Sequence, residues 1–181
     1  MVVQLAKLGS LRSSVATFAM ITIQGKPYAF VVDTGAAQTT VTSTVVSALG
    51  LPEDGSPISL KTIGCPVRAQ PVTMRSWSIA GHTLPTTQVL SAPVSEGSVH
   101  SVDGVTYGGQ LGSDVLSSFG RVSINFSSGR MTLGASDPSR GRAVPMRVYR
   151  RGHMVLPVVT ATLDRKSARW IPDTGASLTQ V

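Results

Sequence analysis

The chain has 181 residues, with 16 Lys and Arg against nine Asp and Glu and a single cysteine. Hydrophobic residues make up 41% and charged residues 14%, and the 18 glycines and 11 prolines interrupt the sequence throughout. This composition is too apolar for a disordered chain and too interrupted for a helical bundle. One cysteine excludes an internal disulfide and a cysteine-based metal cluster. We therefore expect many short strands joined by turns.

The first apolar run, residues 15–23, follows Lys7 and Arg12 and superficially resembles a secretion signal. Residues 18–23 and 28–32 are apolar and β-branched, however, and the turn sequence Gln-Gly-Lys-Pro separates them. These two segments predict a hairpin. No apolar stretch approaches the ~20 residues that span a bilayer. We expect no membrane span, and the compartment stays open.

Two segments predict short helices, each preceded by a hydroxyl side chain and followed by glycine. They are residues 43–49, with Thr42 or Ser43 as the cap and Gly50 as the stop, and residues 114–119, with Ser113 as the cap and Gly120 as the stop. Two segment pairs predict hairpins. They are residues 76–79 with 83–90, and residues 121–126 with 130–133.

The sequence contains an internal repeat. Residues 18–41 align without gaps to residues 158–181 at a constant offset of 140, and both copies contain Asp-Thr-Gly-Ala. Chance is a poor explanation for two such strings in one register. The repeat also favours a strand over a secretion signal for the first apolar run. It predicts one complete unit in residues 1–136, a linker in residues 137–145, and the first strands of an incomplete second unit in residues 146–181.

Five arginines cluster on and just after the predicted linker. They are Arg140, Arg142, Arg147, Arg150 and Arg151. Clustered cations can bind phosphates, but no aromatic platform or nucleic-acid motif accompanies them. We interpret the cluster as an exposed linker and predict no nucleic-acid partner.

The repeated string places a carboxylate at the end of an apolar strand. Asp33 follows Phe30-Val31-Val32, Gly35 gives the backbone freedom that a tight loop needs, and Thr34 supplies a hydroxyl that can brace the loop. Such a loop holds a carboxylate in a fixed position while the residues around it stay shielded from water.

With its context, this loop resembles the retropepsin-like branch of the aspartic peptidases. Residues 28–41 resemble the first family signature, and residues 109–116, GQLGSDVL, resemble the second, in which an apolar residue and Gly precede a short helix. Residues 119–126 and 129–133 resemble the closing strands of bacterial relatives. The resemblance implies an all-β acid-protease barrel lobe with short helices, plus the start of a second homologous lobe.

The resemblance also implies a function, that of an aspartic endopeptidase without cofactor or metal, acting on an extended peptide or protein substrate. Asp33 and Asp173 would form the catalytic dyad and share one proton, because two adjacent carboxylates cannot both ionise. Thr34 and Thr174 would cross-brace the loops, and Gly35 and Gly175 would permit their turns. Because Ala36 and Ala176 stand where many acid-active relatives have a hydroxyl, we expect activity nearer neutral pH than in pepsin-like enzymes.

A flap over the substrate is expected between the first loop and the second signature. We assign it to the segment around Ile63, Gly64 and Cys65, although Pro66 is unfavourable in a paired strand. We interpret Cys65 as a small apolar residue rather than a nucleophile. The three histidines, His82, His100 and His153, lack metal-ligand spacing and are predicted to be surface or turn residues.

Two departures from the family pattern leave three hypotheses open. Pro172 precedes Asp173 at the position where Val32 precedes Asp33, so the second loop loses a backbone donor. In addition, only eight residues follow Asp173. The chain would be part of a two-lobed peptidase, a homodimeric peptidase that uses Asp33 from two chains, or a non-catalytic binding or assembly module. We favour the first, because a second Asp-Thr-Gly would be superfluous in a homodimer.

Overall fold

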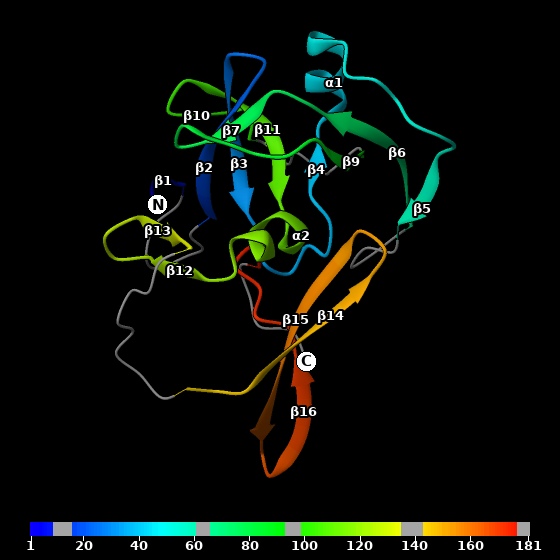
Figure 1. Ribbon diagram of the computed structural model, residues 1–181. Helices are drawn as coiled ribbons and strands as arrows, with labels where there is room; N and C mark the ends of the chain where they lie inside the picture. The colour runs from blue at the N-terminus through cyan, green and yellow to red at the C-terminus, as the bar shows by residue number, and fades with distance from the viewer. Residues whose placement is uncertain (9–15, 61–65, 93–98, 135–142, 177–181) are drawn as a thin grey trace.

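The computed structural model describes residues 1–8, 16–60, 66–92, 99–134 and 143–176. These residues form one sheet of thirteen strands and a separate sheet of three (Figure 1). The larger sheet contains β1 (Val2–Leu8), β2 (Ala16–Ile23), β3 (Lys26–Val32), β4 (Thr40–Val41), β5 (Ile58–Leu60), β6 (Val67–Met74), β7 (Trp77–Ile79), β8 (His82–Thr83), β9 (Thr87–Ser91), β10 (Ser101–Val102), β11 (Val105–Leu111), β12 (Val122–Asn125) and β13 (Arg130–Leu133). The smaller sheet contains β14 (Met146–Arg151), β15 (Met154–Leu163) and β16 (Lys166–Trp170).

Helices are few and short. They are α1 (Ser43–Leu49), α2 (Ser113–Leu116) and the 3₁₀ turn Ser117–Phe119 that continues α2. The predicted all-β class is thereby confirmed. No helix among the described residues is long and apolar enough to cross a membrane.

Strand β3 lies at the centre of the larger sheet. It pairs with β2 in antiparallel and with β11 in parallel orientation, and β11 also pairs with β4. The chain that leaves β3 must therefore pass over the end of β11 before it enters β4. The loop between β3 and β4 is held there, because the N–H of Asp33 donates to the carbonyl of Leu111 at 3.1 Å.

Strands β2 and β3 are apolar on both faces because both faces are covered. Ile21 and Phe30 are fully buried in the main core cluster. On the opposite face, Phe18 and Ala29 pack with Tyr107 in a second cluster. Two-sided burial fixes the position of β3 and of the loop that follows it.

The internal repeat is reproduced pair for pair in the hairpins. Ala19 pairs with Phe30 in one copy and Val159 with Trp170 in the other, and the register stays equivalent to the turns. Both two-residue turns have positive φ angles, at Gln24-Gly25 and at Asp164-Arg165. This geometry fits the right-handed twist of a hairpin. The offset of 140 is thus a structural repeat.

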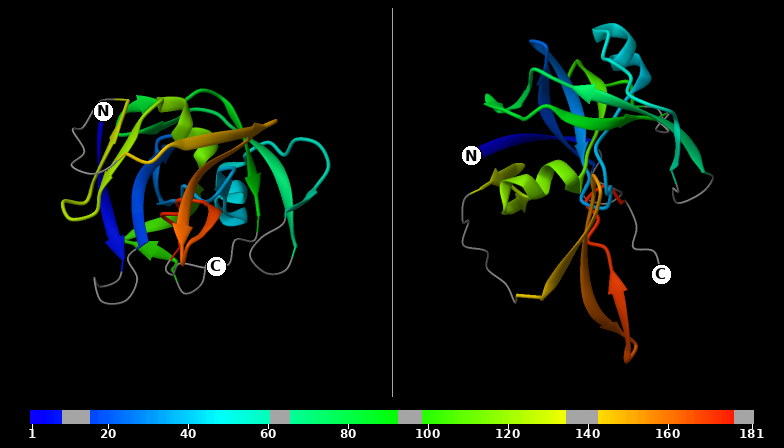
Figure 2. Two further views of the ribbon diagram at one scale, coloured as in Figure 1. Left: turned by 90° about the horizontal axis from the view of Figure 1, so that it is seen from below. Right: turned by 45° about the vertical axis from the view of Figure 1, so that its right-hand side comes forward.

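The smaller sheet extends away from the rest of the molecule (Figure 2). All six residues of β14 are exposed, whereas Val155 of β15 is buried. The N–H of Val155 donates to the carbonyl of Ala37 at 2.8 Å, which joins this sheet to the loop between β3 and β4.

Most predicted elements are confirmed. Helix α1 has the predicted bounds, and its cap is Thr42, whose hydroxyl accepts from the N–H of Val45 at 3.3 Å. Residues 16–23 form strand β2, as the repeat predicts. Residues 121–126 and 130–133 contain the paired strands β12 and β13.

Three predictions were wrong in part. The second helix begins at Ser113 itself, with Gly112 as a cap that has no side chain. Residues 83–90 do not form one strand: β8 pairs with β7, but β9 pairs with β4 and β6. Arg147, Arg150 and Arg151 are exposed as expected, yet they belong to β14 rather than to a linker. Arg140 and Arg142 lie outside the described residues.

Candidate active site

In the loop after β3, backbone N–H groups donate to the carboxylate of Asp33, which belongs to the same loop. Oδ1 of Asp33 accepts the backbone N–H groups of Gly35 and Ala36, each at 2.9 Å. Asp33 itself is only 8% exposed. Two backbone donors on one oxygen fix the orientation of the carboxyl group and leave Oδ2 for other partners.

The loop after β16 repeats this arrangement. Oδ1 of Asp173 accepts the N–H groups of Gly175 at 2.8 Å and of Ala176 at 3.1 Å. The two Asp-Thr-Gly-Ala strings therefore fold into the same local structure, 140 residues apart.

The two loops are joined by reciprocal hydrogen bonds of their threonines. The hydroxyl of Thr34 donates to the carbonyl of Pro172 and the hydroxyl of Thr174 donates to the carbonyl of Val32, both at 2.6 Å. Each hydroxyl also accepts the backbone N–H of the other threonine at 3.1 Å. The four bonds form a symmetric brace, and they bring together the predicted residues of the two loops.

The glycines of the loops face the opposite carboxyl groups. A Cβ atom on Gly35 would collide with the carboxyl group of Asp173, and a Cβ atom on Gly175 would lie 2.5 Å from Cγ of Asp33. Both positions therefore require glycine for space rather than for an unusual φ. Asp33 and Asp173 meet where the two loops face each other.

This proximity changes the ionisation of Asp33. Burial, followed by the negative charge of Asp173 and a side-chain hydrogen bond with it, raises the pKa of Asp33 from 3.8 to about 6. The N–H groups of Ala36 and Gly35 favour the carboxylate and oppose part of this rise. The pair consequently retains a proton at pH values where an ordinary aspartic acid has lost it.

A second set of hydrogen bonds supports the loop that carries Asp33, and these bonds were not predicted from the sequence. The hydroxyl of Ser113 donates to the carbonyl of Thr34 at 2.8 Å, which is why it does not cap α2. Oδ1 of Asp114 accepts the N–H of Thr39 at 2.9 Å and its hydroxyl at 2.7 Å. Burial raises the pKa of Asp114, although these bonds oppose the rise. Ser113 and Asp114, at the start of α2, thus hold the Asp33 loop in place.

Pro172 does not disturb the second loop. The pairing of β15 with β16 ends at Val159 and Trp170, and the same register continued for two more positions would place Pro157 opposite Pro172. Pro172 lies beyond the last pair, so its missing N–H removes no bond of the pairing between β15 and β16. Its carbonyl remains available to Thr34.

The other predicted site residues are placed as follows. Ile63, Gly64 and Cys65 lie outside the described residues. Strands β5 and β6 pair on either side of that segment, and Pro66 precedes β6 rather than interrupting it. His82, His100 and His153 are exposed.

A cavity of about 470 Å³ lies beside the loops, between α2 and the smaller sheet. Thr34 and Thr174 line it, together with Met146, Val148 and Pro157, whereas Asp33 and Asp173 do not. The carboxyl groups of Asp33 and Asp173 are therefore not part of the lining of this cavity.

Comparison with curated proteins found no matching sequence. A family model described as aspartyl protease matches residues 19–115, which extend from β2 to α2 and include the Asp33 loop and its Ser113–Asp114 support. Because this match covers more than half of the 181 residues, the chain belongs to the aspartyl protease family.

Proposed function

We propose that the chain carries the catalytic dyad of an aspartic endopeptidase, formed by Asp33 and Asp173. The observation that carries this proposal is the symmetric brace through Thr34 and Thr174, which holds two identically folded carboxylate loops face to face. The raised pKa of Asp33 supports it, since a shared proton is what this chemistry requires.

In the proposed reaction, the dyad works with one proton between its two carboxyl groups. The ionised carboxylate removes a proton from a water molecule, whose oxygen attacks the carbonyl carbon of the scissile peptide bond. The protonated carboxyl group donates to the carbonyl oxygen, which becomes a hydroxyl in the tetrahedral intermediate. Proton transfer to the leaving nitrogen then permits the C–N bond to break. No cofactor or metal takes part in this scheme.

We also propose the domain division that the repeat predicts: a first lobe in residues 1–136, a linker in 137–145 and part of a second lobe in 146–181. Two observations support it, the separate sheets and the equivalent register of the two hairpins. Under this division the dyad lies between lobes of one chain. A homodimer that pairs Asp33 with its own symmetry mate would have to displace the Asp173 loop from the brace.

The test is cleavage of an unfolded protein substrate by the full chain and by its Asp33→Asn and Asp173→Asn variants. Both variants should lose cleavage while they keep the wild-type unfolding curve at pH 4. Activity that persists in Asp33→Asn would reject the dyad. Loss in Asp33→Asn alone, with an active Asp173→Asn enzyme that sediments as a dimer, would favour the homodimer.

The wild-type chain and a mixture of the Asp33→Asn and Asp173→Asn chains should both be tested. If neither cleaves any substrate although the chains are folded, the non-catalytic module is the better interpretation. Mixing is informative because Asp33→Asn and Asp173→Asn chains restore activity only if dyads form between chains.

A further inference from the structure

One face of the larger sheet carries the side chain of Asp33. The pairing of β3 with β11 continues as far as Asp33, whose N–H donates to the carbonyl of Leu111 at 3.1 Å. Side chains alternate between the two faces of a strand, so Asp33 points to the same face as Val31. Val32, which lies between them, is 0% exposed in the main core on the opposite face. We call the face that carries Asp33 the dyad face.

A row of four side chains crosses the dyad face. Gln110 of β11 is the pairing partner of both Val31 and Thr40. Thr40 also pairs with Leu90 of β9. Paired residues of neighbouring strands project to the same face. The row therefore consists of two polar side chains, Gln110 and Thr40, between two apolar ones.

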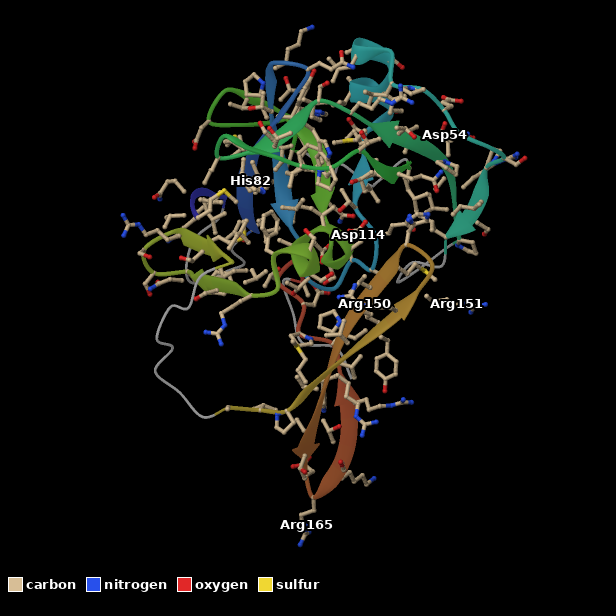
Figure 3. The ribbon with its side chains drawn as sticks, viewed as in Figure 1. Asp54, His82, Asp114, Arg150, Arg151 and Arg165 are labelled. Atoms are coloured by element: carbon tan, nitrogen blue, oxygen red, sulfur yellow. The ribbon has the colours of Figure 1, made fainter. Side chains whose placement is uncertain are left out.

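The row lies close to the carboxyl group of Asp33. Neighbouring strands are about 4.8 Å apart and two residues rise about 6.6 Å, so the Cα atoms of Gln110 and Asp33 are about 8 Å apart. Figure 1 shows β3 and β11 side by side, with both arrowheads directed toward α2. Figure 3 labels Asp114 in α2, and Gln110 lies four residues before it, at the same end of the sheet. An extended substrate advances about 3.3 Å per residue, so side chains within two positions of a bond held at Asp33 can reach Gln110.

The fold gains little from Gln110. This side chain is half-buried, whereas the next residue, Leu111, is 0% exposed. Its Oε1 accepts the hydroxyl of Thr40 at 3.4 Å, which is long for an O–H···O bond. Within the part of the chain that the structure describes, Nε2 has no hydrogen-bond partner. A glutamine that interrupts an apolar row of a central strand without a clear gain in stability is typical of a functional position.

The amide group of Gln110 suits a neutral side chain that can form hydrogen bonds. Nε2 has two N–H donors, and Oε1 has a second lone pair, so a substrate amide can match both groups. A substrate carboxylate could accept from Nε2, but in the proposed reaction the nearby dyad carries one negative charge, which repels it. A leucine side chain would shield the amide of Gln110 from water without offering it a bond.

This arrangement belongs to the first unit of the chain. The strands that carry the row, β3, β4, β9 and β11, are members of one sheet. All four residues of the row lie within residues 19–115, the segment that matches the aspartyl protease family. The position of Gln110 relative to Asp33 is therefore set by the pairing of these strands and not by the residues that follow them.

We propose that Gln110, with Thr40 beside it, is a specificity-determining residue that selects substrates with asparagine or glutamine within two residues of the cleaved bond. This inference rests on the proposed peptidase function. It adds a substrate class that the dyad does not specify, because the dyad acts on water and on the main-chain carbonyl of the substrate.

The test is the cleavage of a defined peptide mixture by the full chain. Mass spectrometry identifies each cleaved bond and gives the residue types at the two positions on either side of it. Two peptides that differ only at the preferred position, with Gln or Leu, then give a ratio of kcat/KM values. A ratio measured in one variant cancels any change in the dyad itself. We expect the wild-type chain to prefer the Gln peptide at least about fivefold, which corresponds to a hydrogen bond of about 1 kcal/mol.

Three variants separate the amide from its surroundings. Gln110→Leu should prefer the Leu peptide. Gln110→Glu has the same shape and keeps an acceptor for Thr40, but it lacks the N–H donors and should lose the preference for Gln. The control is Gln4→Leu, an exposed glutamine of β1, which should keep the wild-type ratio. Urea unfolding followed by tryptophan fluorescence shows which variants are folded, and Gln110→Glu alone is sufficient if Gln110→Leu does not fold.

Three results would overturn the proposal. The first is a wild-type cleavage profile in which asparagine and glutamine are not enriched. The second is the same ratio of the two kcat/KM values in the wild-type chain and in Gln110→Glu. The third is faster cleavage of a Glu peptide than of the Gln peptide by the wild-type chain, which would indicate recognition of charge.

Failure of this proposal is distinguishable from failure of the proposed function. Cleavage without a preference for amides rejects only the role of Gln110, whereas a folded chain that cleaves nothing rejects the peptidase function. In that case, binding decides. The probes are fluorescein-labelled peptides in which a CH₂–NH unit replaces one peptide bond and is flanked on both sides by Gln or by Leu. Tighter binding of the Gln probe, lost in Gln110→Glu, would support recognition by Gln110, and equal binding of the two probes would overturn it.

Discussion

The raised pKa of Asp33 predicts that ionising the dyad destabilises the fold, and Asp33→Asn should remove that cost. Asn keeps an oxygen for the N–H groups of Gly35 and Ala36 and places an uncharged NH₂ group toward Asp173. A folded-state pKa above the unfolded value means that the folded chain binds more protons between the two values. The associated stability is complete below pH 3.8 and is lost as the pH rises through about 6.

The size of the effect follows from the shift. A change from 3.8 to about 6 corresponds to about 3 kcal/mol, at about 1.4 kcal/mol for each pKa unit. The free energy of unfolding of Asp33→Asn, relative to the wild-type chain, should therefore rise by about 2.5 kcal/mol between pH 4 and pH 8, because a small part of the effect is already present at pH 4. For a domain whose total stability is about 5–15 kcal/mol, this is readily measured.

The assay is urea unfolding at a series of pH values, followed by the fluorescence of the two tryptophans, of which Trp77 is 1% exposed in the core. Asp103→Asn, in an exposed turn, measures what the exchange of Asp for Asn does elsewhere, and its effect is subtracted at each pH. A relative stability of Asp33→Asn that does not change between pH 4 and pH 8 would refute the raised pKa. A decrease toward pH 8 would mean that the ionised carboxylate stabilises the fold.

Three further predictions concern the loops. Gly35→Ala should abolish cleavage, because the added methyl collides with the carboxyl group of Asp173; an active Gly35→Ala enzyme would contradict the face-to-face placement. Thr34→Val should lower the free energy of unfolding by about 1–3 kcal/mol and reduce kcat, because it removes the bonds to Pro172 and Thr174. Thr34→Ser, which keeps the hydroxyl, should retain most of the stability and most of kcat. Equal losses in Thr34→Val and Thr34→Ser would argue against the brace. The pH profile of kcat/KM should fall as the pH rises through about 6, where Asp33 loses its proton; a rate optimum below about pH 3 would contradict the mechanism.

Local patterns were sufficient for the hairpin of β2 and β3, for that of β12 and β13, and for α1, because their turn and cap residues act within a few positions of themselves. The repeat was visible because Asp-Thr-Gly-Ala is a rare string at a fixed offset. Ser113 was misjudged because a hydroxyl before a helix predicts a cap, whereas its actual partner, the carbonyl of Thr34, is 79 residues away. No local rule reveals such a partner.

The effect of Pro172 was likewise beyond the sequence, because it depends on where the pairing of the two strands ends. Only the register shows that the pairing ends at Val159 and Trp170, before Pro172 is reached. The arginines of β14 were interpreted as an exposed linker because clustered charges are typical of exposed segments. The alternating side chains of Met-Arg-Val-Tyr-Arg, which are typical of a strand, were given less weight. Pro85, in contrast, was a visible warning that residues 83–90 could not form one paired strand.

The brace between the two loops has a consequence for how such duplicated halves diverge. Each threonine hydroxyl recognises a main-chain oxygen, of Val32 or of Pro172, and every amino acid supplies that oxygen. The residue before the aspartate can therefore change without loss of the junction, as the exchange of valine for proline illustrates. Selection on the junction falls on the threonine and glycine of each string, while the flanking strands are free to acquire different surfaces, hydrophobic in one half and cationic in the other.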